Sequence, residues 1–349
     1  MIEDMAKDFK RKQLSIIYMG TPEFAVAGLE ALLDHHYHVV AVVTMPDKPA
    51  GRGHQVQFSP VKQYALEKGL PVLQPEKLKD ETFLAELRSY QADLQIVTAF
   101  RMLPEVVWAM PRLGTFNVHG SLLPQYRGAA PINWAVINGE KETGLTTFML
   151  KQEIDTGNMI LQERINIGEN EDAGSVHDRL MELSKDMVLK TVQLIEECDR
   201  EGKPLPVVPQ PELPDLKPAP KIFKETCEID FRKTAQEVHN FIRGLSPYPG
   251  AWCDLDFGEN NIKRVKIFAS EPTGITRHPN STIGKPLIYW YDKMILIPCE
   301  DAYIAVRELQ LPNRRRMGVR DALNGLLNEL GLDPKQIVRV DEPSYDAFA

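Results

Sequence analysis

Short apolar runs alternate with amphipathic segments along the first 200 residues of the chain. The apolar runs, which are typical of buried strands, cover residues 14–20, 38–44, 70–74, 93–100 and 114–120. Helical periodicity separates them at residues 24–33, 59–68, 81–90 and 104–110. Because each connection is too long for a hairpin turn, the pattern predicts a Rossmann-like α/β domain with a parallel sheet and helices on both faces.

A change in composition follows this domain. Two more strand candidates, residues 144–150 and 159–167, precede an amphipathic helix at 175–197, and seven prolines then crowd residues 202–220. Such a stretch favours an extended connector. Beyond it, a helix at 235–244 and short alternating runs, among them residues 251–257, 294–299 and 303–311, predict a smaller β-rich domain resembling an OB-like barrel. We therefore expect a catalytic domain at 1–201, a Pro-rich linker at 202–223 and a C-terminal domain at 224–349.

Composition and charge narrow the class of protein. The chain has 349 residues, of which 43% are hydrophobic and 26% charged, as in ordinary soluble globular proteins. Its net charge of -8 argues against binding nucleic acid over the whole surface but allows a local basic site. No run approaches the ~18 apolar residues of a membrane span. The four cysteines form no CxxC pair, so we expect no metal site and a cytoplasmic location.

Candidate chemistry begins at the end of the 114–120 run. Side chains alternate along a strand, so Asn117 and His119 share one face, and Gly120 ends the strand. Ligands of open parallel sheets collect beyond the carboxyl ends of the strands. Two polar residues near a strand end are a weak signal when taken alone. The pair nevertheless predicts a site at this edge of the sheet.

Two further segments add to that site. In SLLPQYRGAAP, prolines and Gly128 favour a rigid loop, which could form the wall for a flat ligand or simply cap the sheet. Asp155 follows the 144–150 run in an Asp-Thr-Gly turn, from which we expect it to reach the same carboxyl-end cleft; an ordinary Asx-turn is the alternative. An amide, an imidazole and a carboxylate suit attack on a carbonyl carbon by direct transfer, without a nucleophilic Ser or Cys.

These segments resemble the folate-dependent formyltransferases. The resemblance runs from Leu14 onward and rests on MGTPEFA, TMPDKPAGRG, FNVHGSLLPQYRGAAP, EIDTG, APKIFKETCEIDF and LSPYPGAW. It implies 10-formyltetrahydrofolate as co-substrate, no metal, and a catalytic set of Asn117, His119 and Asp155. The residues that it places along the folate pocket are Ser121, Leu122, Leu123 and Pro124.

Within that family, GTPEF and PAGRG are similar to members that act on tRNA. The resemblance implies formyl transfer from N10 of the folate to the α-amino group of initiator methionyl-tRNA. It marks the segment after the second strand as a loop that contacts the acceptor stem through Arg52 and Lys48. His54 and Gln55 stand where lysines are commoner, so the electrostatic contribution there could be weaker.

The C-terminal half offers one further basic patch, Arg314, Arg315, Arg316 and Arg320, which is either a tRNA contact or a solvated turn before a helix near Val319. The Tyr and Trp of YPGAW, Tyr248 and Trp252, are expected in the domain core. We expect a monomer.

Three other functions remain open at this point. A sugar-nucleotide N-formyltransferase would share the folate loop and the three polar residues, although PAGRG and the Pro-linked β domain argue against it. A formyl-folate hydrolase would have an extra domain before Leu14, and only about a dozen residues precede it. A catalytically silent folate- or RNA-binding module would not need the intact Asn117, His119 and Asp155.

Overall fold

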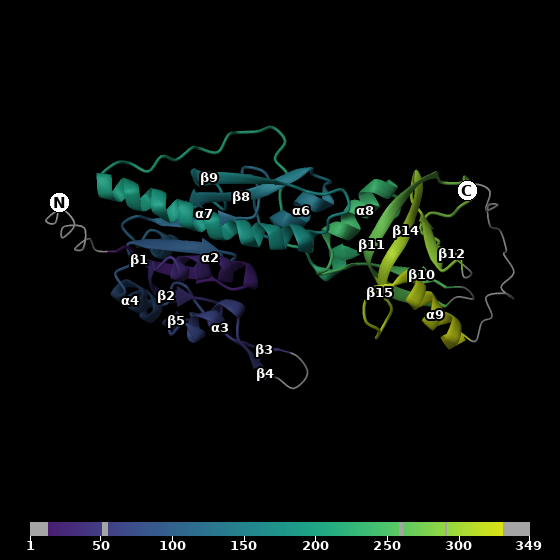
Figure 1. The fold of residues 1–349 in the computed structure, drawn as a ribbon, viewed down its shortest axis with the longest axis horizontal. Coiled ribbons are helices and arrows are strands. Elements are labelled where there is room, and N and C mark those ends of the chain that lie inside the picture. The colour runs from purple at the N-terminus through teal and green to yellow at the C-terminus, as the bar shows by residue number, and fades with distance from the viewer. Residues whose placement is uncertain (1–12, 51–54, 258–260, 290–291, 331–349) are drawn as a thin grey trace. The chain divides into compact units, whose positions relative to one another are not determined.

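The computed structural model describes residues 13–50, 55–257, 261–289 and 292–330, which fold as two compact units (Figure 1). Unit 1 contains the chain up to Pro131, Thr143–Ile165 and His177–Ala219. Unit 2 contains Ile132–Glu142, Asn166–Val176 and the chain from Pro220. The two units therefore interleave along the sequence. The division of the chain into a catalytic domain at 1–201, a linker at 202–223 and a C-terminal domain at 224–349 stays a prediction.

A seven-stranded sheet forms the centre of unit 1, in the order β5-β2-β1-β6-β7-β8-β9. In chain order the strands are β1 Ser15–Gly20, β2 His38–Val43, β5 Val72–Leu73, β6 Leu94–Thr98, β7 Thr115–His119, β8 Glu142–Met149 and β9 Met159–Asn166. The five strands from β5 to β7 pair in parallel, as the sequence predicts, whereas β8 runs antiparallel to β7. The α/β fold is confirmed, with a mixed sheet.

Helices cover both faces of the parallel part of this sheet. The helices of unit 1 are α2 Glu23–Asp34, α3 Pro60–Glu67, α4 Glu81–Ser89, α5 Glu105–Trp108 and most of α7 Ala173–Glu201. Ile17 and Met19 of β1 pack with Leu84 of α4 on one face. Their neighbours Ile16 and Tyr18 are also fully buried but point to the other face, where α2 packs on β1, β2 and β6.

Two helices differ from the sequence predictions. The helix expected at 104–110 is only one turn long, Glu105–Trp108, because Pro111 follows it and a residue before proline is disfavoured in the helical region. Helix α6, Pro131–Ile137, was not predicted, although Pro131 stands at its first turn, where proline is favoured.

An antiparallel sheet forms unit 2, in the order β10-β11-β14-β13-β12, with β15 beside β14. Its strands are β10 Ala251–Asp256, β11 Ile262–Thr276, β12 Leu287–Tyr289, β13 Met294–Pro298, β14 Ala302–Gln310 and β15 Met317–Gly318. The pairing of β11 with β14 shifts register three times, and such bulges bend a strand and curl its sheet. The predicted β-rich domain is confirmed. Among the described strands no pairing joins β10 to β12, so the sheet is curled and open there.

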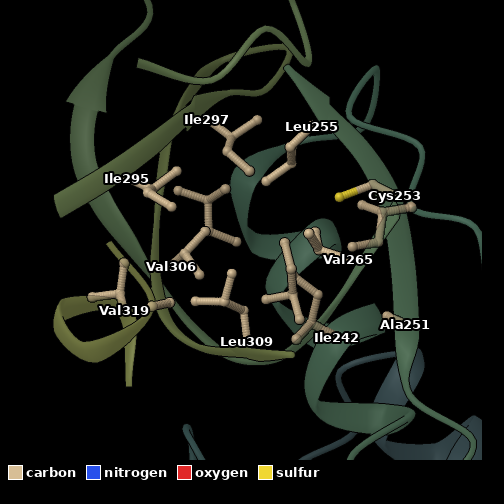
Figure 2. Packing of buried hydrophobic residues seen from close by; sticks show 14 of the residues in the cluster. Ile242, Ala251, Cys253, Leu255, Val265, Ile295, Ile297, Val306, Leu309 and Val319 are labelled. Atoms are coloured by element: carbon tan, nitrogen blue, oxygen red, sulfur yellow. The ribbon is translucent and has the colours of Figure 1, made fainter. Parts of the chain in front are cut away.

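The core of unit 2 lies inside this curl, where Leu255, Val265 and Val306 point toward one another (Figure 2). Helix α8, Ala235–Gly244, begins and ends as the sequence predicts, and a capping box between Thr234 and Glu237 fixes its start. Helix α9, Val319–Leu330, adds leucines to the same cluster. Three free thiols, those of Cys227, Cys253 and Cys299, are buried in this core as well.

The expectation for YPGAW is wrong for one of its aromatic residues. Tyr248 is 78% exposed, because the chain turns at this point before β10 begins. Trp252 is partly buried against the core, and its indole N–H donates to the carbonyl oxygen of Lys224 at 2.8 Å. Its outer face carries the guanidinium of Arg264, 4.1 Å from the ring centroid.

None of the described helices is long and apolar enough to cross a membrane. The part of the chain that the structure describes also holds no cluster of three His, Cys, Asp or Glu side chains with the spacing of a metal site.

Candidate active site

Strand β7 places Asn117 and His119 on one face of the unit 1 sheet, between β6 and β8. Asn117 is partly exposed and His119 is buried, with 7% of its surface accessible. The ring of His119 meets the edge of the Phe148 ring from β8, with centroids 6.4 Å apart. The period-two prediction therefore holds: both polar side chains leave the same face near the carboxyl end of β7.

The imidazole of His119 has two different neighbours. Its Nε2 lies 2.8 Å from the carbonyl oxygen of Tyr126, and a carbonyl can only accept, so Nε2 carries a proton and donates. Its Nδ1 lies 3.9 Å from Oδ2 of Asp155, which is beyond direct hydrogen-bond distance. Nδ1 is thus the ring nitrogen that remains for chemistry, and it faces a carboxylate.

Asp155 reaches His119, but not by the route that the sequence suggested. Because β8 is antiparallel to β7, Met149 at its end pairs with Phe116 near the start of β7, while His119 pairs with Thr146. The carboxyl end of β8 therefore lies beside the amino end of β7, away from His119. The chain after Met149 turns back, and Asp155 adopts a left-handed φ of 54°, a conformation that Asp tolerates better than most residues.

The rigid loop after β7 holds the carboxylate in place. The backbone N–H of Gly128 donates to Oδ2 of Asp155 at 2.9 Å. Gly128 has a φ of 127°, and a Cβ at this position would come within 2.4 Å of the Ala219 carbonyl oxygen. Only glycine fits this close approach. The loop thus touches both partners, through Tyr126 for His119 and through Gly128 for Asp155.

The SLLP residues of the same loop are fixed from inside the protein. Ser121 Oγ donates to the Gln125 carbonyl at 2.7 Å, and Thr146 Oγ1 donates to the Ser121 carbonyl at 2.7 Å. The side chains of Ser121, Leu123 and Pro124 are buried, whereas Leu122 is partly exposed. A folate lining made by these four residues stays a prediction. Leu122 is the most accessible of the four residues.

One residue of this region has no counterpart in the sequence predictions. Gln210 lies in the Pro-rich stretch and donates to the carbonyl oxygens of Asp155 at 2.7 Å and of Gly157 at 2.9 Å. In the sequence it is a polar residue between two prolines, and no local pattern marks it.

The predicted acceptor-stem segment is a short hairpin at its base. Strands β3, Lys48–Ala50, and β4, Gln55–Gln57, pair antiparallel, where the sequence suggested an irregular loop. Lys48 begins β3, and Arg52 lies outside the described residues. Lys62, which follows the segment, pairs with Asp47, and hydrogen bonds from Lys62 and Gln74 lower the pKa of the Asp47 carboxyl.

The arginine-rich segment of unit 2, residues 314–320, does not act as one group. Arg316 donates to Glu308 and lies over the Phe268 ring, 4.8 Å from its centroid. Arg314 is exposed and lines a surface hollow. Other residues around this hollow are Lys224, Trp252, Arg264 and Lys266. No local sequence pattern predicts this basic cluster, because four segments of the chain contribute to it.

Comparison with known families agrees with the geometry of both units. The family model described as formyl transferase matches residues 12–192, and the model of the formyl transferase C-terminal domain matches residues 221–327. The chain belongs to the formyl transferase family.

Curated relatives are similar over most of their length. A methionyl-tRNA formyltransferase of Bacteroides fragilis is 55% identical over 323 residues, covering 90% of this chain and 96% of the relative. One of Bacteroides thetaiotaomicron is 54% identical over 320 residues, covering 90% and 97%.

Solved structures share the fold at low identity. WlaRD, a sugar 3N-formyl transferase solved with dTDP and 5-N-formyl-THF, has a TM-score of 0.58 at 20% identity and covers 87% of this chain and all of its own. HypX from Aquifex aeolicus, solved with tetrahydrofolic acid, has a TM-score of 0.57 at 18% identity and covers 90% of this chain and 48% of its own. At such identities the likeness concerns the fold.

Proposed function

We propose that this protein transfers the formyl group of 10-formyltetrahydrofolate to the α-amino group of methionine carried by initiator tRNA. The observation that carries the proposal is the meeting of His119 and Asp155 beside Asn117, from segments more than 30 residues apart, in a chain about 55% identical to proteins named methionyl-tRNA formyltransferase. Folate is the formyl donor on the strength of the family.

The three side chains suit the chemistry of this transfer. The neutral amine attacks the formyl carbon, and the Asn117 amide donates to the oxygen on which negative charge develops. Nε2 of His119 is already committed to Tyr126, so His119 can donate to that oxygen only through Nδ1. Nδ1 must then carry a proton as well, and the Asp155 carboxylate, 3.9 Å away, can hold or receive it.

Proton transfer completes the reaction. The attacking nitrogen loses a proton as the new C–N bond forms, and N10 of the folate gains one as the old C–N bond breaks. Asp155, directly or through a water, is the group that we propose for this exchange. Replacing Asn117 by Ala removes one donor and should lower the turnover rate about 10²- to 10³-fold.

We propose that tRNA contacts come from two places. One is the hairpin segment with Lys48 and Arg52, which the family resemblance supports. The other is the hollow that Arg314 lines together with Lys224 and Lys266, where these cations outnumber the one carboxylate in the lining, that of Glu225. With a net charge of -8 overall, tRNA binding would have to rely on such local clusters.

We also propose that the protein acts as a monomer in the cytoplasm, where charged tRNA is made and used. Size-exclusion chromatography with light scattering would test the monomer, because a dimer would have twice the chain mass of 39.5 kDa.

The decisive experiment offers two acceptors to the purified protein. With 10-formyltetrahydrofolate present, methionyl initiator tRNA should become formylated, measured as formylmethionine after deacylation. A dTDP-linked amino sugar should not react. Formylation of the amino sugar alone would replace the proposal by the sugar-directed alternative.

A further inference from the structure

The Pro-rich stretch is hydrogen-bonded to other parts of unit 1 at several residues, and two of these residues are shielded from solvent. Between residues 208 and 220 every side chain is exposed except Gln210, which is partly buried, and Ala219, which is fully buried. Four prolines lie between these two residues or next to Gln210, and they hold the chain extended and semi-rigid. The segment of residues 208–219 is therefore a stiff strap with an anchor near each end.

The first anchor is the side-chain amide of Gln210, and all of its hydrogen-bonding positions are used. Its Nε2 donates to the carbonyl oxygens of Asp155 and Gly157. Its Oε1 accepts from Nε of Arg127 at 3.1 Å and from Nη2 at 2.5 Å. The two carbonyls and the guanidinium fix which end of the amide is which. Gln210 thus joins the turn that carries Asp155 to the loop that follows β7.

The second anchor is the backbone of Ala219. Its N–H donates to the Arg127 carbonyl at 2.9 Å, and its carbonyl accepts from Ala129 at 2.8 Å. Two residues earlier, the Lys217 carbonyl accepts from the Tyr126 N–H at 2.7 Å. The atoms that hold His119 and Asp155, the Tyr126 carbonyl and the Gly128 N–H, belong to this same short stretch of loop.

From this arrangement we propose that the 208–219 segment is a brace of the catalytic site, and that Gln210 is the positioning residue for Asp155. The Asp155 backbone is held in the left-handed region, which a free turn would leave readily, and the Gln210 amide binds the carbonyl of that very residue. A displacement of about 1 Å at a reacting group can cost ~10²-fold in rate. As a positioning residue, Gln210 acts through Asp155.

The brace proposal extends the proposed formyl transfer, and its kinetic test rests on that activity. We expect Gln210→Ala to lower kcat about 10- to 100-fold, with KM for the folate and for the tRNA within about twofold of wild type. Gln210→Glu should lose as much, because its carboxylate keeps the Arg127 pair but opposes the carbonyls of Asp155 and Gly157. Because Gln210→Glu keeps the contact with Arg127, it tests the positioning of Asp155 even if Gln210→Ala folds poorly.

A matched control exists in the loop that faces this strap. Gln125 also joins the loop to the segment by two hydrogen bonds, from Nε2 to the Asp215 carbonyl and from the Lys217 N–H to Oε1. It does not contact the turn of Asp155. Gln125→Ala should therefore leave kcat within about threefold of wild type, at a similar cost in melting temperature. An equal loss of turnover in both variants would show that the segment is merely structural.

A double-mutant cycle separates positioning from general damage. If Gln210 acts through the Asp155 carboxylate, Gln210→Ala should add less than about twofold to the loss caused by Asp155→Asn, measured in single turnover. If its full 10- to 100-fold effect appears again in the Asp155→Asn background, Gln210 acts independently of Asp155 and the proposal is overturned.

Amide hydrogen exchange tests the brace without any measurement of catalysis. In the folate-free protein, amide hydrogen exchange of peptides covering residues 125–130 and 150–158 should become faster in Gln210→Ala, and at 150–158 should not change in Gln125→Ala. Unchanged exchange at 150–158 in Gln210→Ala would refute the brace. A wild-type protein that fails to formylate tRNA while this exchange pattern holds would refute the proposed substrate alone.

Discussion

Two buried histidines show how differently the two units use the same side chain. In unit 1, His119 donates through Nε2 to a carbonyl, while its Nδ1 faces Asp155 across 3.9 Å. In unit 2, His239 of α8 has partners for both nitrogens, the Ser270 hydroxyl and the Glu169 carbonyl, each at 3.3 Å. One ring has a nitrogen that lies beyond hydrogen-bond distance of its neighbouring carboxylate, and the other ring has partners for both nitrogens.

The charged groups around each histidine follow the same division. Asp155 reaches His119 from a distant turn, accepts a hydrogen bond from the Gly128 N–H and has a left-handed φ. Beside His239, Arg243 is buried and donates to the carbonyls of Gly168 and Glu171, and burial lowers its pKa. The proposed active site has a residue with a left-handed φ and an incomplete set of contacts, whereas the groups around His239 have their hydrogen bonds satisfied.

The strongest way to break this comparison is to neutralise Asp155. Asp155→Asn keeps the size of the side chain but cannot take up a proton, so turnover should fall about 10²- to 10⁴-fold while folate affinity, measured by fluorescence titration, stays near wild type. Glu153→Gln makes the same chemical change at an exposed position of the same turn and should be silent. An unchanged rate for Asp155→Asn would remove this carboxylate from the mechanism.

A second change alters the loop that contacts both His119 and Asp155. Gly128→Ala puts a Cβ 2.4 Å from the Ala219 carbonyl oxygen at a φ of 127°, and we expect a loss of about 1–3 kcal/mol in the free energy of unfolding, together with a clear loss of turnover. Gly69 also has a positive φ, but a Cβ there meets nothing within 4 Å. Gly69→Ala should cost about 1 kcal/mol by urea unfolding and leave turnover unchanged. Equal activities of the two variants would contradict the tight role of Gly128.

A third change compares two arginines of unit 2. Arg314 is exposed on the basic hollow, while the charge of Arg316 is opposed by Glu308. Arg314→Ala should weaken tRNA binding a few-fold and reduce the slope of log K against log salt by about 1. Arg316→Ala should change tRNA affinity less, and stability by about 0–1 kcal/mol. Filter binding at several salt concentrations measures the tRNA affinity of both variants. A larger loss of affinity in Arg316→Ala than in Arg314→Ala would place the tRNA contact at Arg316 and not at the hollow.

The smallest effect concerns pH and the structural histidine. Burial lowers the pKa of His239, with a further contribution from nearby Arg243 that Glu271 opposes in part. In the unfolded chain its pKa is about 6.5, so below that value the unfolded state binds more protons. Stability contributed by neutral His239 is therefore complete above about pH 6.5 and is lost as the pH falls through the folded pKa. Urea unfolding between pH 7.5 and 5 should show this decline, and His239→Gln should flatten it.

The sequence predicts features that depend on neighbouring residues, but not those that depend on distant segments of the chain lying side by side. Asn117 and His119 share a face because strands alternate, and the helix at 235–244 has its capping residues beside it. The motif predicts Asp155 near His119, and the two side chains do lie 3.9 Å apart, but the predicted path of the chain is wrong because an apolar run does not reveal the direction of its strand. Gln210 has no local signal at all, because its role arises only when the 208–219 segment lies back along the loop of Gly128.

Alkylation of the buried thiols of unit 2 can report on transient exposure of the unit 2 core. Burial raises the pKa of Cys227, Cys253 and Cys299, so that very little nucleophilic thiolate forms while the core is closed. Cys198 on α7 is the partly accessible fourth thiol of the chain. Alkylating reagents at neutral pH should therefore label Cys198 first, and the later, slower uptake of label would time the transient exposure of the curled sheet.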